Sequence, residues 1–475
     1  MSTIKVRNPF TKEIVFSQAS ESFETVNAKV NAAQAASRTW RKVAPEHRAE
    51  ILEEALDYFR QNKEDIAIGI AREMGKPKSA AEQELDFMLE RAEYMCRFAR
   101  DGALKANDLS AYRDEGFQGR LERTAKGVVY IITPWNYPLF CAINGTICAL
   151  LAGSSVALKH TTTPSVGSHF EKAFGTLNGI DNMLVNVTID FDVSARIIEE
   201  TDINHVVFTG SVRGGQTVQQ SVAKRAFNDV PSPFIECSLE LGSSDASYIA
   251  EDADIEDALL WAVKIGRLHN SGQSCCAVKR IYVHENIYDD FLSRAKGVFD
   301  AEVNGDPFDE ATTLGPLYGG DTAIDCLMSM IEDAKSKGAR VVTGGETEEV
   351  GGVKFLKPTL LADITPDMDV VQEETFGPVL PVMKVSSDEA AINEVKRTKF
   401  GLTSSIFTRS KERAETFIDA MDSGTVYVNR CNFVDARLGW VGQKHSGNGS
   451  VGLSPEGLIA FSHTKSVNID PSKLK

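Results

Sequence analysis

The sequence contains no long hydrophobic run and no apolar leader at its start. Its longest apolar stretch, residues 139–151, is interrupted by Asn144, Gly145 and Thr146, and it is too short to cross a bilayer as a helix. Residues 1–7 lack the apolar core of a secretory signal. We therefore expect no membrane association and a cytoplasmic location.

Cysteine, histidine and positive charge are also scarce, and each shortage argues against a class of protein. The 475 residues include 8 cysteines, none in a C-x-x-C pair, which is too few for a disulfide scaffold and fits a reducing compartment. The 8 histidines show no metal-ligand spacing, so we expect no catalytic metal. The net charge of −16 at pH 7 argues against nucleic acid as the main partner.

The chain does contain a regular alternation of short apolar runs and helical patterns. Apolar positions at three- and four-residue spacing predict helices over residues 20–42, 47–74 and 76–105. From about residue 127 the alternation predicts a parallel α/β sheet, which binds ligands at the carboxyl ends of its strands. Its expected strands are residues 127–132, 155–159, 183–187, 205–208 and 234–239, with helices over residues 139–151, 164–177, 193–200 and 214–225.

A second α/β block is expected over residues 252–429, and the chain length also favours more than one domain. The expected helices lie near residues 255–268, 289–303, 322–337 and 388–398, and the strands near residues 279–283, 379–385, 405–407 and 425–428.

The chemistry-bearing residues are a cysteine, a carboxylate and an amide. Cys275 follows a helical pattern and small polar residues, Glu240 lies between two leucines, and Asn136 lies in a Pro-Trp-Asn-Tyr-Pro run. Together they offer a nucleophile, a base and an oxyanion donor for thioester chemistry on a carbonyl. An isolated cysteine is more often a small buried residue, and Glu240 could be a surface carboxylate at a strand end. Burial of Glu240 would raise its pKa and suit it to act as a base.

Two strand ends could hold a nucleotide. The run Phe208–Gly215 (FTGSVRGG) follows an expected strand and opens a helix, so its backbone amides could approach a pyrophosphate. It is not the usual G-x-G-x-x-G, and a plain strand-to-helix turn is the alternative. Lys159 ends another strand, where it could bond a ribose or phosphate or simply be solvated.

Six motifs in order resemble those of the aldehyde dehydrogenase superfamily, and the similarity covers essentially the whole chain. They are PWNYP (134–138), LK (158–159), FTGS (208–211), ELG (240–242), GQSC (272–275) and EETFGP (373–378). The resemblance implies an α/β fold with a Rossmann-like cofactor-binding domain (1–108 and 126–241), an α/β catalytic domain (242–445) and a β-arm for oligomerisation (109–125 and 446–475). It also implies a homodimer or homotetramer.

The resemblance further assigns roles to single residues. Cys275 is the implied nucleophile, Glu240 the implied base that activates water, and Asn136 the implied oxyanion donor. The implied activity is oxidation of a small-molecule aldehyde to a carboxylic acid through a thiohemiacetal and a thioester, with NAD or NADP as cofactor. The implied cofactor-binding residues are Trp135, Lys159, Thr162, Gly210, Ser211, Gly215, Glu374 and Phe376.

Departures from the family pattern bear on cofactor and substrate. Thr162 stands where a ribose-binding glutamate is frequent, and its loss removes a charge that would repel a 2′-phosphate, so NADP is expected alongside NAD. The residues before Cys275 resemble the succinate-semialdehyde branch, but its substrate arginines align with Asn144 and His269. Neither of these is an arginine, which argues against a carboxylated semialdehyde and leaves it as an alternative only. Arg430 could contact an anionic substrate, but a structural role is the more frequent one for such a residue.

Two other functions remain alternatives to a hydrolytic aldehyde dehydrogenase. A CoA-acylating enzyme would gain nothing from a water-activating Glu240. A catalytically silent, nucleotide-binding oligomer would not need Cys275, Asn136 and Glu240 together.

Overall fold

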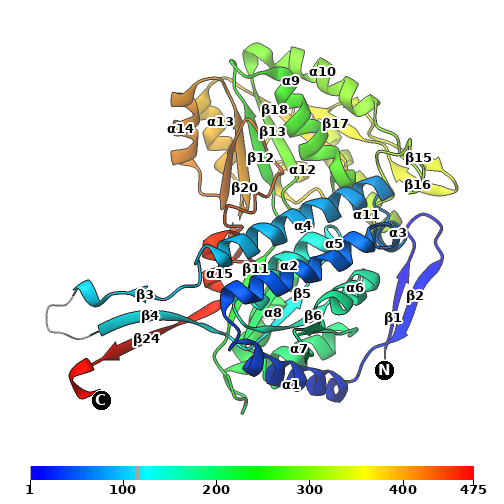
Figure 1. The fold of residues 1–475 in the computed structure, drawn as a ribbon. Helices are drawn as coiled ribbons and strands as arrows, with labels where there is room; N and C mark the ends of the chain where they lie inside the picture. The colour runs from blue at the N-terminus through cyan, green and yellow to red at the C-terminus, as the bar shows by residue number, and fades with distance from the viewer. Residues whose placement is uncertain (1, 113–117, 475) are drawn as a thin grey trace.

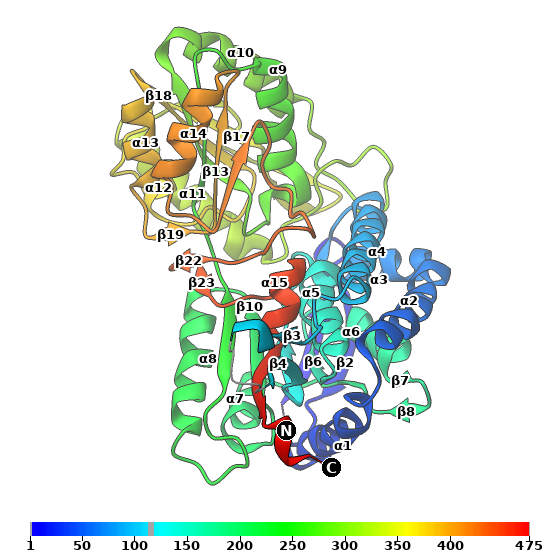
Figure 2. The same ribbon diagram turned by 60° about the vertical axis from the view of Figure 1, so that its left-hand side comes forward.

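Two α/β lobes and a projecting arm make up the computed structural model, which describes residues 2–112 and 118–474 (Figures 1 and 2). The first lobe contains a six-stranded sheet in which β23 is antiparallel to β11 and the other strands run parallel. Its order is β23 (Gly447–Asn448), β11 (Glu236–Glu240), β10 (His205–Thr209), β5 (Val128–Ile132), β6 (Ser155–Lys159) and β9 (Leu184–Asn186).

Helices cover both faces of this sheet because its central strands are buried on both sides. One face packs against α1 (Phe23–Trp40), α7 (Phe191–Glu200) and α8 (Val212–Arg225). The other packs against α2 (Pro45–Gln61), α3 (Lys63–Met74), α4 (Lys78–Arg100), α5 (Pro138–Leu151) and α6 (Pro164–Phe174). The single helix expected over residues 47–74 is therefore wrong. It is two helices, since Asn62 leaves the helical conformation (φ −110°, ψ 19°).

The second lobe contains a seven-stranded sheet in which only the edge strand β14 is antiparallel. Its order is β14 (Arg340–Thr343), β17 (Thr359–Ala362), β18 (Val379–Val385), β13 (Val278–His284), β12 (Asp245–Ile249), β20 (Thr403–Phe407) and β21 (Thr425–Val428). Its helices are α9 (Ile255–Ala258), continued by a π-helix (Leu259–Leu268), α10 (Tyr288–Asp300), α11 (Gly320–Ser336), α12 (Asp369–Gln372), α13 (Asp388–Lys396) and α14 (Lys411–Ala420).

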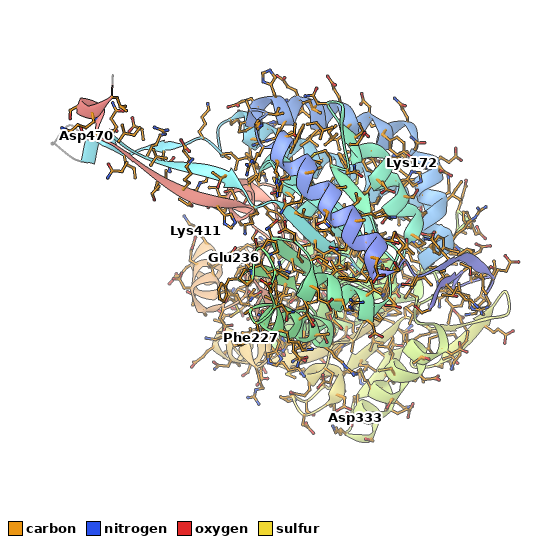
Figure 3. All side chains as sticks on the ribbon, turned by 90° about the horizontal axis from the view of Figure 1, so that it is seen from below. Lys172, Phe227, Glu236, Asp333, Lys411 and Asp470 are labelled. Carbon is orange, nitrogen blue, oxygen red and sulfur yellow. The ribbon has the colours of Figure 1, made fainter. Side chains whose placement is uncertain are left out.

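The arm leaves the first lobe as a three-stranded antiparallel ribbon (Figure 3). It pairs β24 (Ser462–Ile469) with β4 (Gln118–Ala125) along their full length, and β4 with β3 (Asn107–Asp108). Residues 113–117, expected in the arm, lie outside the described residues. The segment between β23 and β24 forms α15 (Ser454–Ala460), which packs on α4 and α5. The division of the chain into domains stays a prediction.

Smaller hairpins complete the molecule. The first, β1 (Thr3–Arg7) with β2 (Ile14–Ala19), lies before the first expected helix, in a segment for which no strand was expected. Two more hairpins are β7 (Thr176–Leu177) with β8 (Ile180–Asp181) and β15 (Thr347–Val350) with β16 (Val353–Leu356). The short strand β19 (Phe400–Gly401) pairs antiparallel with β22 (Gln443–Lys444), which lies far from it in the chain.

Candidate active site

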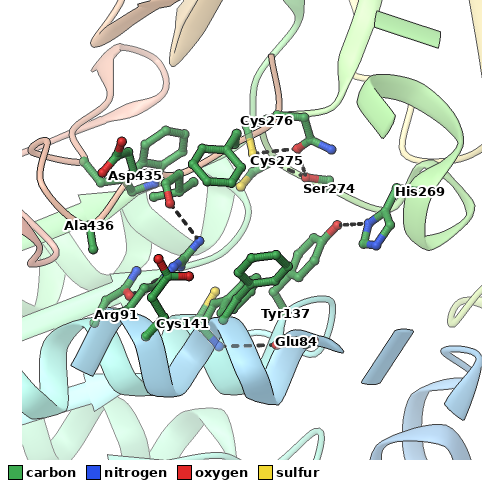
Figure 4. Close-up of a pocket in the computed structure, with 18 of the residues that line it drawn as sticks. Glu84, Arg91, Tyr137, Cys141, His269, Ser274, Cys275, Cys276, Asp435 and Ala436 are labelled. Carbon is green, nitrogen blue, oxygen red and sulfur yellow. Dashed lines mark hydrogen bonds between the residues drawn. The ribbon is translucent and has the colours of Figure 1, made fainter. Parts of the chain in front are cut away.

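A cavity of about 550 Å³ lies between the two lobes, and both Cys275 and Glu240 line it. Figure 4 shows Cys275 and Cys276 at this cavity. Its walls come from α4, α5, the end of the π-helix, the cysteine loop and the loop that follows β21. Aromatic side chains dominate much of the lining: Phe87, Tyr94, Tyr137, Phe140, Trp261, Phe433 and Trp440. The cavity therefore offers a small organic molecule an apolar enclosure with a few polar groups.

The loop that carries Cys275 is held in an unusual backbone conformation. Asn270 and Ser271 both have φ of 55°, and Gly272 has φ of 71°, a region that is unfavourable for residues with a side chain. The Asn270 amide stabilises the turn by donating to the Asn136 carbonyl at 2.9 Å and to the Gln273 carbonyl at 3.1 Å. These bonds tie the cysteine loop to the segment after β5.

Asn136 lies against this same turn. Its side-chain Nδ2 donates to the Gln273 carbonyl at 3.2 Å, and the residue is 5% exposed. The amide is thus held against the backbone of Gln273, which lies two residues before Cys275 in the chain. A fixed N–H donor at this place suits a site where negative charge develops on a carbonyl oxygen.

Lys279, which the sequence analysis did not single out, holds the cysteine loop from behind. It is fully buried at the start of β13 and donates to the Ser274 carbonyl at 2.6 Å, to Ser243 Oγ at 3.1 Å and to the Cys275 carbonyl. Its ammonium also lies 3.4 Å from the Glu374 carboxylate. The available sequence signal was a charged residue at the second position of a strand whose later residues include Ile281, Tyr282 and Val283.

Glu240 is a buried carboxyl group at the end of β11. It is 3% exposed, and its Oε1 has no hydrogen-bond partner among the residues that the structure describes. Burial raises the pKa of Glu240 to about 7, contact with the Cys275 thiol opposes the rise, and the nearby Glu374 carboxylate adds to it. The group therefore exchanges its proton near neutral pH, as a general base requires.

The two adjacent cysteines differ in access. Cys275 is half-buried, whereas Cys276 is 7% exposed, with its thiol 3.0 Å from Asn432 Oδ1. Interaction with Cys276, burial and the Glu240 carboxylate raise the pKa of Cys275 well above its usual range. In this state Cys275 is a neutral thiol that needs a base to become a nucleophile, and Glu240 is the base beside it.

The expected cofactor residues fall into two groups, one at the carboxyl edge of the first sheet and one around the cysteine loop. Lys159 ends β6 and donates to Thr161 Oγ1 at 2.6 Å. Burial lowers the pKa of Lys159 to about 8, and the nearby Asp190 carboxylate partly opposes this decrease. Thr162 Oγ1 is buried and, within residues 2–112 and 118–474, has no hydrogen-bond partner. Ser211 caps α8 by accepting from the Gly214 N–H at 3.1 Å.

The other group surrounds the cysteine loop. The Glu374 carboxylate accepts from the Ser243 N–H at 3.0 Å, and a side chain at Gly242 would collide with it. Phe376 contacts the Trp135 ring edge-on, with centroids 5.6 Å apart. The Trp135 ring itself stacks on Tyr318 at 4.4 Å. The two glycines belong to the first group, because they follow β10 of the first sheet. Gly210 donates its N–H to the Glu240 carbonyl at 3.0 Å, and Gly215 packs closely on Leu241.

The three residues discussed for substrate binding all line the cavity. Asn144 lies on α5 and His269 accompanies Tyr137, whose hydroxyl is 2.8 Å from His269 Nδ1. Burial lowers the pKa of His269 to about 4, so it is neutral at pH 7. Arg430 lies over the Phe433 ring at 3.9 Å. The cavity also contains Arg91 of α4, which the sequence analysis missed.

Comparison with known proteins identifies the family. The model of the aldehyde dehydrogenase family matches residues 1–467. Succinate-semialdehyde dehydrogenase [NADP(+)] of Deinococcus radiodurans is 32% identical over 482 residues, covering 98% of this chain and 95% of that protein. The crystal structure of lactaldehyde dehydrogenase from Escherichia coli superposes with a TM-score of 0.91 at 30% identity, covering 99% of this chain and 96% of that one. Succinic semialdehyde dehydrogenase from Streptococcus pyogenes, solved in complex with NADP⁺, gives 0.89 at 28% identity, covering 98% and 99%.

The chain belongs to the aldehyde dehydrogenase family and has its α/β fold. It is an oxidoreductase that oxidises a small-molecule aldehyde with NAD or NADP. This confirms the resemblance inferred from the six motifs. No helix in the described part of the chain is long and apolar enough to cross a membrane. Nor do three or more His, Cys, Asp or Glu side chains of the described residues gather as a metal site.

Proposed function

We propose that this aldehyde dehydrogenase is hydrolytic, with Cys275 as nucleophile, Glu240 as base and Asn136 as oxyanion donor. The observation that carries the proposal is the buried Glu240 carboxyl group, with a pKa near 7, in contact with the Cys275 thiol inside one cavity. With this pKa, the Glu240 carboxyl group is ionised in about half of the molecules at neutral pH, and the ionised form can remove a proton from a thiol or from water.

The residues perform the reaction in two halves. Glu240 takes the Cys275 proton, and the thiolate attacks the aldehyde carbon to form a thiohemiacetal. The Asn136 amide and the Cys275 backbone N–H hold the oxyanion. NAD(P), when bound, supplies the hydride acceptor, and the enzyme is left as a thioester on Cys275. Glu240, after losing its proton to solvent, takes a proton from water, and the resulting hydroxide releases the carboxylic acid.

The described residues fit a dinucleotide at the carboxyl edge of the first sheet. Thr162 Oγ1 is a buried polar atom for which the described residues provide no hydrogen-bond partner, and the helix that Ser211 caps presents its N-terminus at this edge. We assign Lys159 and Thr162 to the adenosine ribose, Gly210, Ser211 and Gly215 to the pyrophosphate, Glu374 to the nicotinamide ribose, and Trp135 and Phe376 to the ring side.

NAD(P)H formation with a panel of aldehydes tests the hydrolytic function. Aliphatic, aromatic and carboxylated aldehydes are supplied with each cofactor, with and without CoA. Sustained turnover without CoA supports the proposal. Turnover that depends on CoA would instead favour an acylating enzyme, and no turnover with any aldehyde would favour a silent nucleotide-binding oligomer.

Replacement of Thr162 by glutamate tests the cofactor assignment. We expect Thr162→Glu to raise the KM for NADP relative to that for NAD by about tenfold or more, because the carboxylate repels a 2′-phosphate and can accept from a 2′-hydroxyl. The control Thr162→Gln introduces a neutral side chain of the same shape as glutamate and should not change the KM for NADP relative to that for NAD. Equal changes in the KM for both cofactors in Thr162→Glu would show that Thr162 does not contact the adenosine ribose.

The arm motivates a proposal on assembly. The strand β24 is exposed along most of its length and lies at the edge of the ribbon, and such an edge pairs readily with another strand. We propose a cytoplasmic homodimer or homotetramer held in part by this ribbon. Light scattering of the purified chain measures the mass, and deletion of residues 462–475 should reduce it; a monomer at micromolar concentration would contradict the proposal.

A further inference from the structure

Two arginines line the active-site cavity without forming an ion pair to a carboxylate of the described chain. Arg91 of α4 is 8% exposed, and its polar contacts are long: 3.5 Å to Asn144 Oδ1 and 3.5 Å to the Val434 carbonyl. Arg430, two residues beyond β21, has a buried Nε for which the described residues offer no acceptor. A buried guanidinium group such as that of Arg91, or a buried N–H such as that of Arg430 Nε, is costly unless paired, so both arginines have unused capacity for an anion.

Aromatic rings hold both guanidinium groups from one face. Arg91 lies 3.8 Å from the centroid of Phe140, and Arg430 lies 3.9 Å from that of Phe433 and 5.1 Å from that of Trp261. A ring against the face of a guanidinium group stabilises the cation but leaves the N–H groups at its edge free. Those edges are the part of arginine that binds a planar carboxylate through two bonds.

The carboxylates of the cavity are already committed elsewhere. Glu84 forms an ion pair with buried Lys76 and accepts from the backbone N–H groups that open α5. Asp435 forms an ion pair with Arg437 at 2.6 Å. Glu240 is buried with a raised pKa, and Glu90 lies at the exposed rim. The net charge left for a ligand to neutralise is therefore positive.

We propose that Arg91 and Arg430 bind the carboxylate of the substrate, so that the enzyme prefers short aldehydes that carry a carboxylate at the far end from the carbonyl. Figure 4 shows Arg91 rising from α4 on the wall opposite Cys275 and Cys276. A carboxylate held by Arg91 leaves the other end of a short chain to face the cysteine loop. This inference rests on the proposed function, in which Cys275 attacks the carbonyl carbon.

A pair of substrates that differ in one charge tests the proposal. The first is 4-oxobutanoate and the second is its methyl ester, which has the same chain and aldehyde but no anion. Arg91→Met and Arg430→Met remove the guanidinium group and keep an unbranched, apolar side chain. Each should lower kcat/KM for 4-oxobutanoate at least about tenfold, mainly through KM, and leave the methyl ester nearly unchanged.

Matched controls separate substrate binding from folding. Arg97→Met makes the same change on the exposed side of the same helix and should leave both substrates as in the wild type. Arg91→Lys should recover only part of the loss, because an ammonium cannot form the paired bonds of arginine. Succinate should compete with 4-oxobutanoate in the wild type and lose this effect in the double variant.

Three results would overturn the proposal. One is an equal loss for both substrates in Arg91→Met and Arg430→Met, which would mean a structural role. Another is a wild-type preference for the methyl ester or for an uncharged aldehyde. The third is a preference for glyceraldehyde 3-phosphate over 4-oxobutanoate, which would assign the arginines to phosphate. No turnover of any aldehyde, by contrast, would refute the hydrolytic function itself.

Discussion

Replacement of Cys275 by alanine abolishes NAD(P)H formation, whereas replacement of Cys276 by alanine leaves most of it. The reason is that the half-buried Cys275 contacts the base Glu240, while Cys276 is nearly fully buried against Asn432. Removing the nucleophile removes the covalent pathway entirely. The measurement is the absorbance of NAD(P)H with an aldehyde that the wild type oxidises.

Binding of the cofactor is the control for this pair of variants. Calorimetric titration with NAD or NADP should give similar affinities for the wild type, Cys275→Ala and Cys276→Ala. The converse pattern, an active Cys275→Ala and an inactive Cys276→Ala, would show that Cys276 is the nucleophile.

Replacement of Glu240 by glutamine slows formation of the first equivalent of NAD(P)H, because Cys275 must then lose its proton to solvent, and it stalls the enzyme after that equivalent. The amide cannot take a proton from water, so the thioester persists, and steady-state turnover falls by about 10²- to 10⁴-fold. In the wild type the base must be ionised, so turnover should rise with pH as Glu240 loses its proton near pH 7 and level off above it. Rapid-mixing absorbance across pH 5.5 to 8.5, about one and a half units on either side of this pKa, resolves the burst from the steady rate.

Glu236→Gln is the matched control, since Glu236 opens the same strand but is exposed and paired with Lys126. It should retain both the wild-type rate and its dependence on pH. Unchanged turnover in Glu240→Gln, or a pH profile that stays the same without Glu240, would reject Glu240 as the base.

The sequence predicted the alternation of the parallel sheets well but missed elements whose residues are polar. The expected strands 155–159, 379–385 and 425–428 coincide with β6, β18 and β21. The buried strand β12 was missed because it begins with Asp245 and contains Ser247. Asp245 accepts from the Thr403 N–H at 2.9 Å and its hydroxyl at 2.7 Å. Partners 158 residues away thus make a polar run compatible with burial.

In the candidate site, too, some residues were predicted from the sequence and others were missed. Cys275, Glu240 and Asn136 were predicted from motifs. The structure places Cys275 and Glu240 in one cavity and Asn136 against the loop that carries Cys275, and the roles of all three stay proposals. Lys279 was missed because its partners are backbone carbonyls that only the folded loop presents. Arg91 was missed because a charged residue on an amphipathic helix usually faces solvent, and only the packing of α4 on α5 turns it inward.

The most direct test of the central claim is mass spectrometry of the Glu240→Gln variant after mixing with cofactor and an oxidisable aldehyde. The account predicts that the peptide containing Cys275 gains the mass of the acyl group, that Cys276 in the same peptide stays unmodified, and that the adduct disappears in Cys275→Ala. An acyl group on Cys276, or a burst of NAD(P)H with no protein adduct, would contradict it.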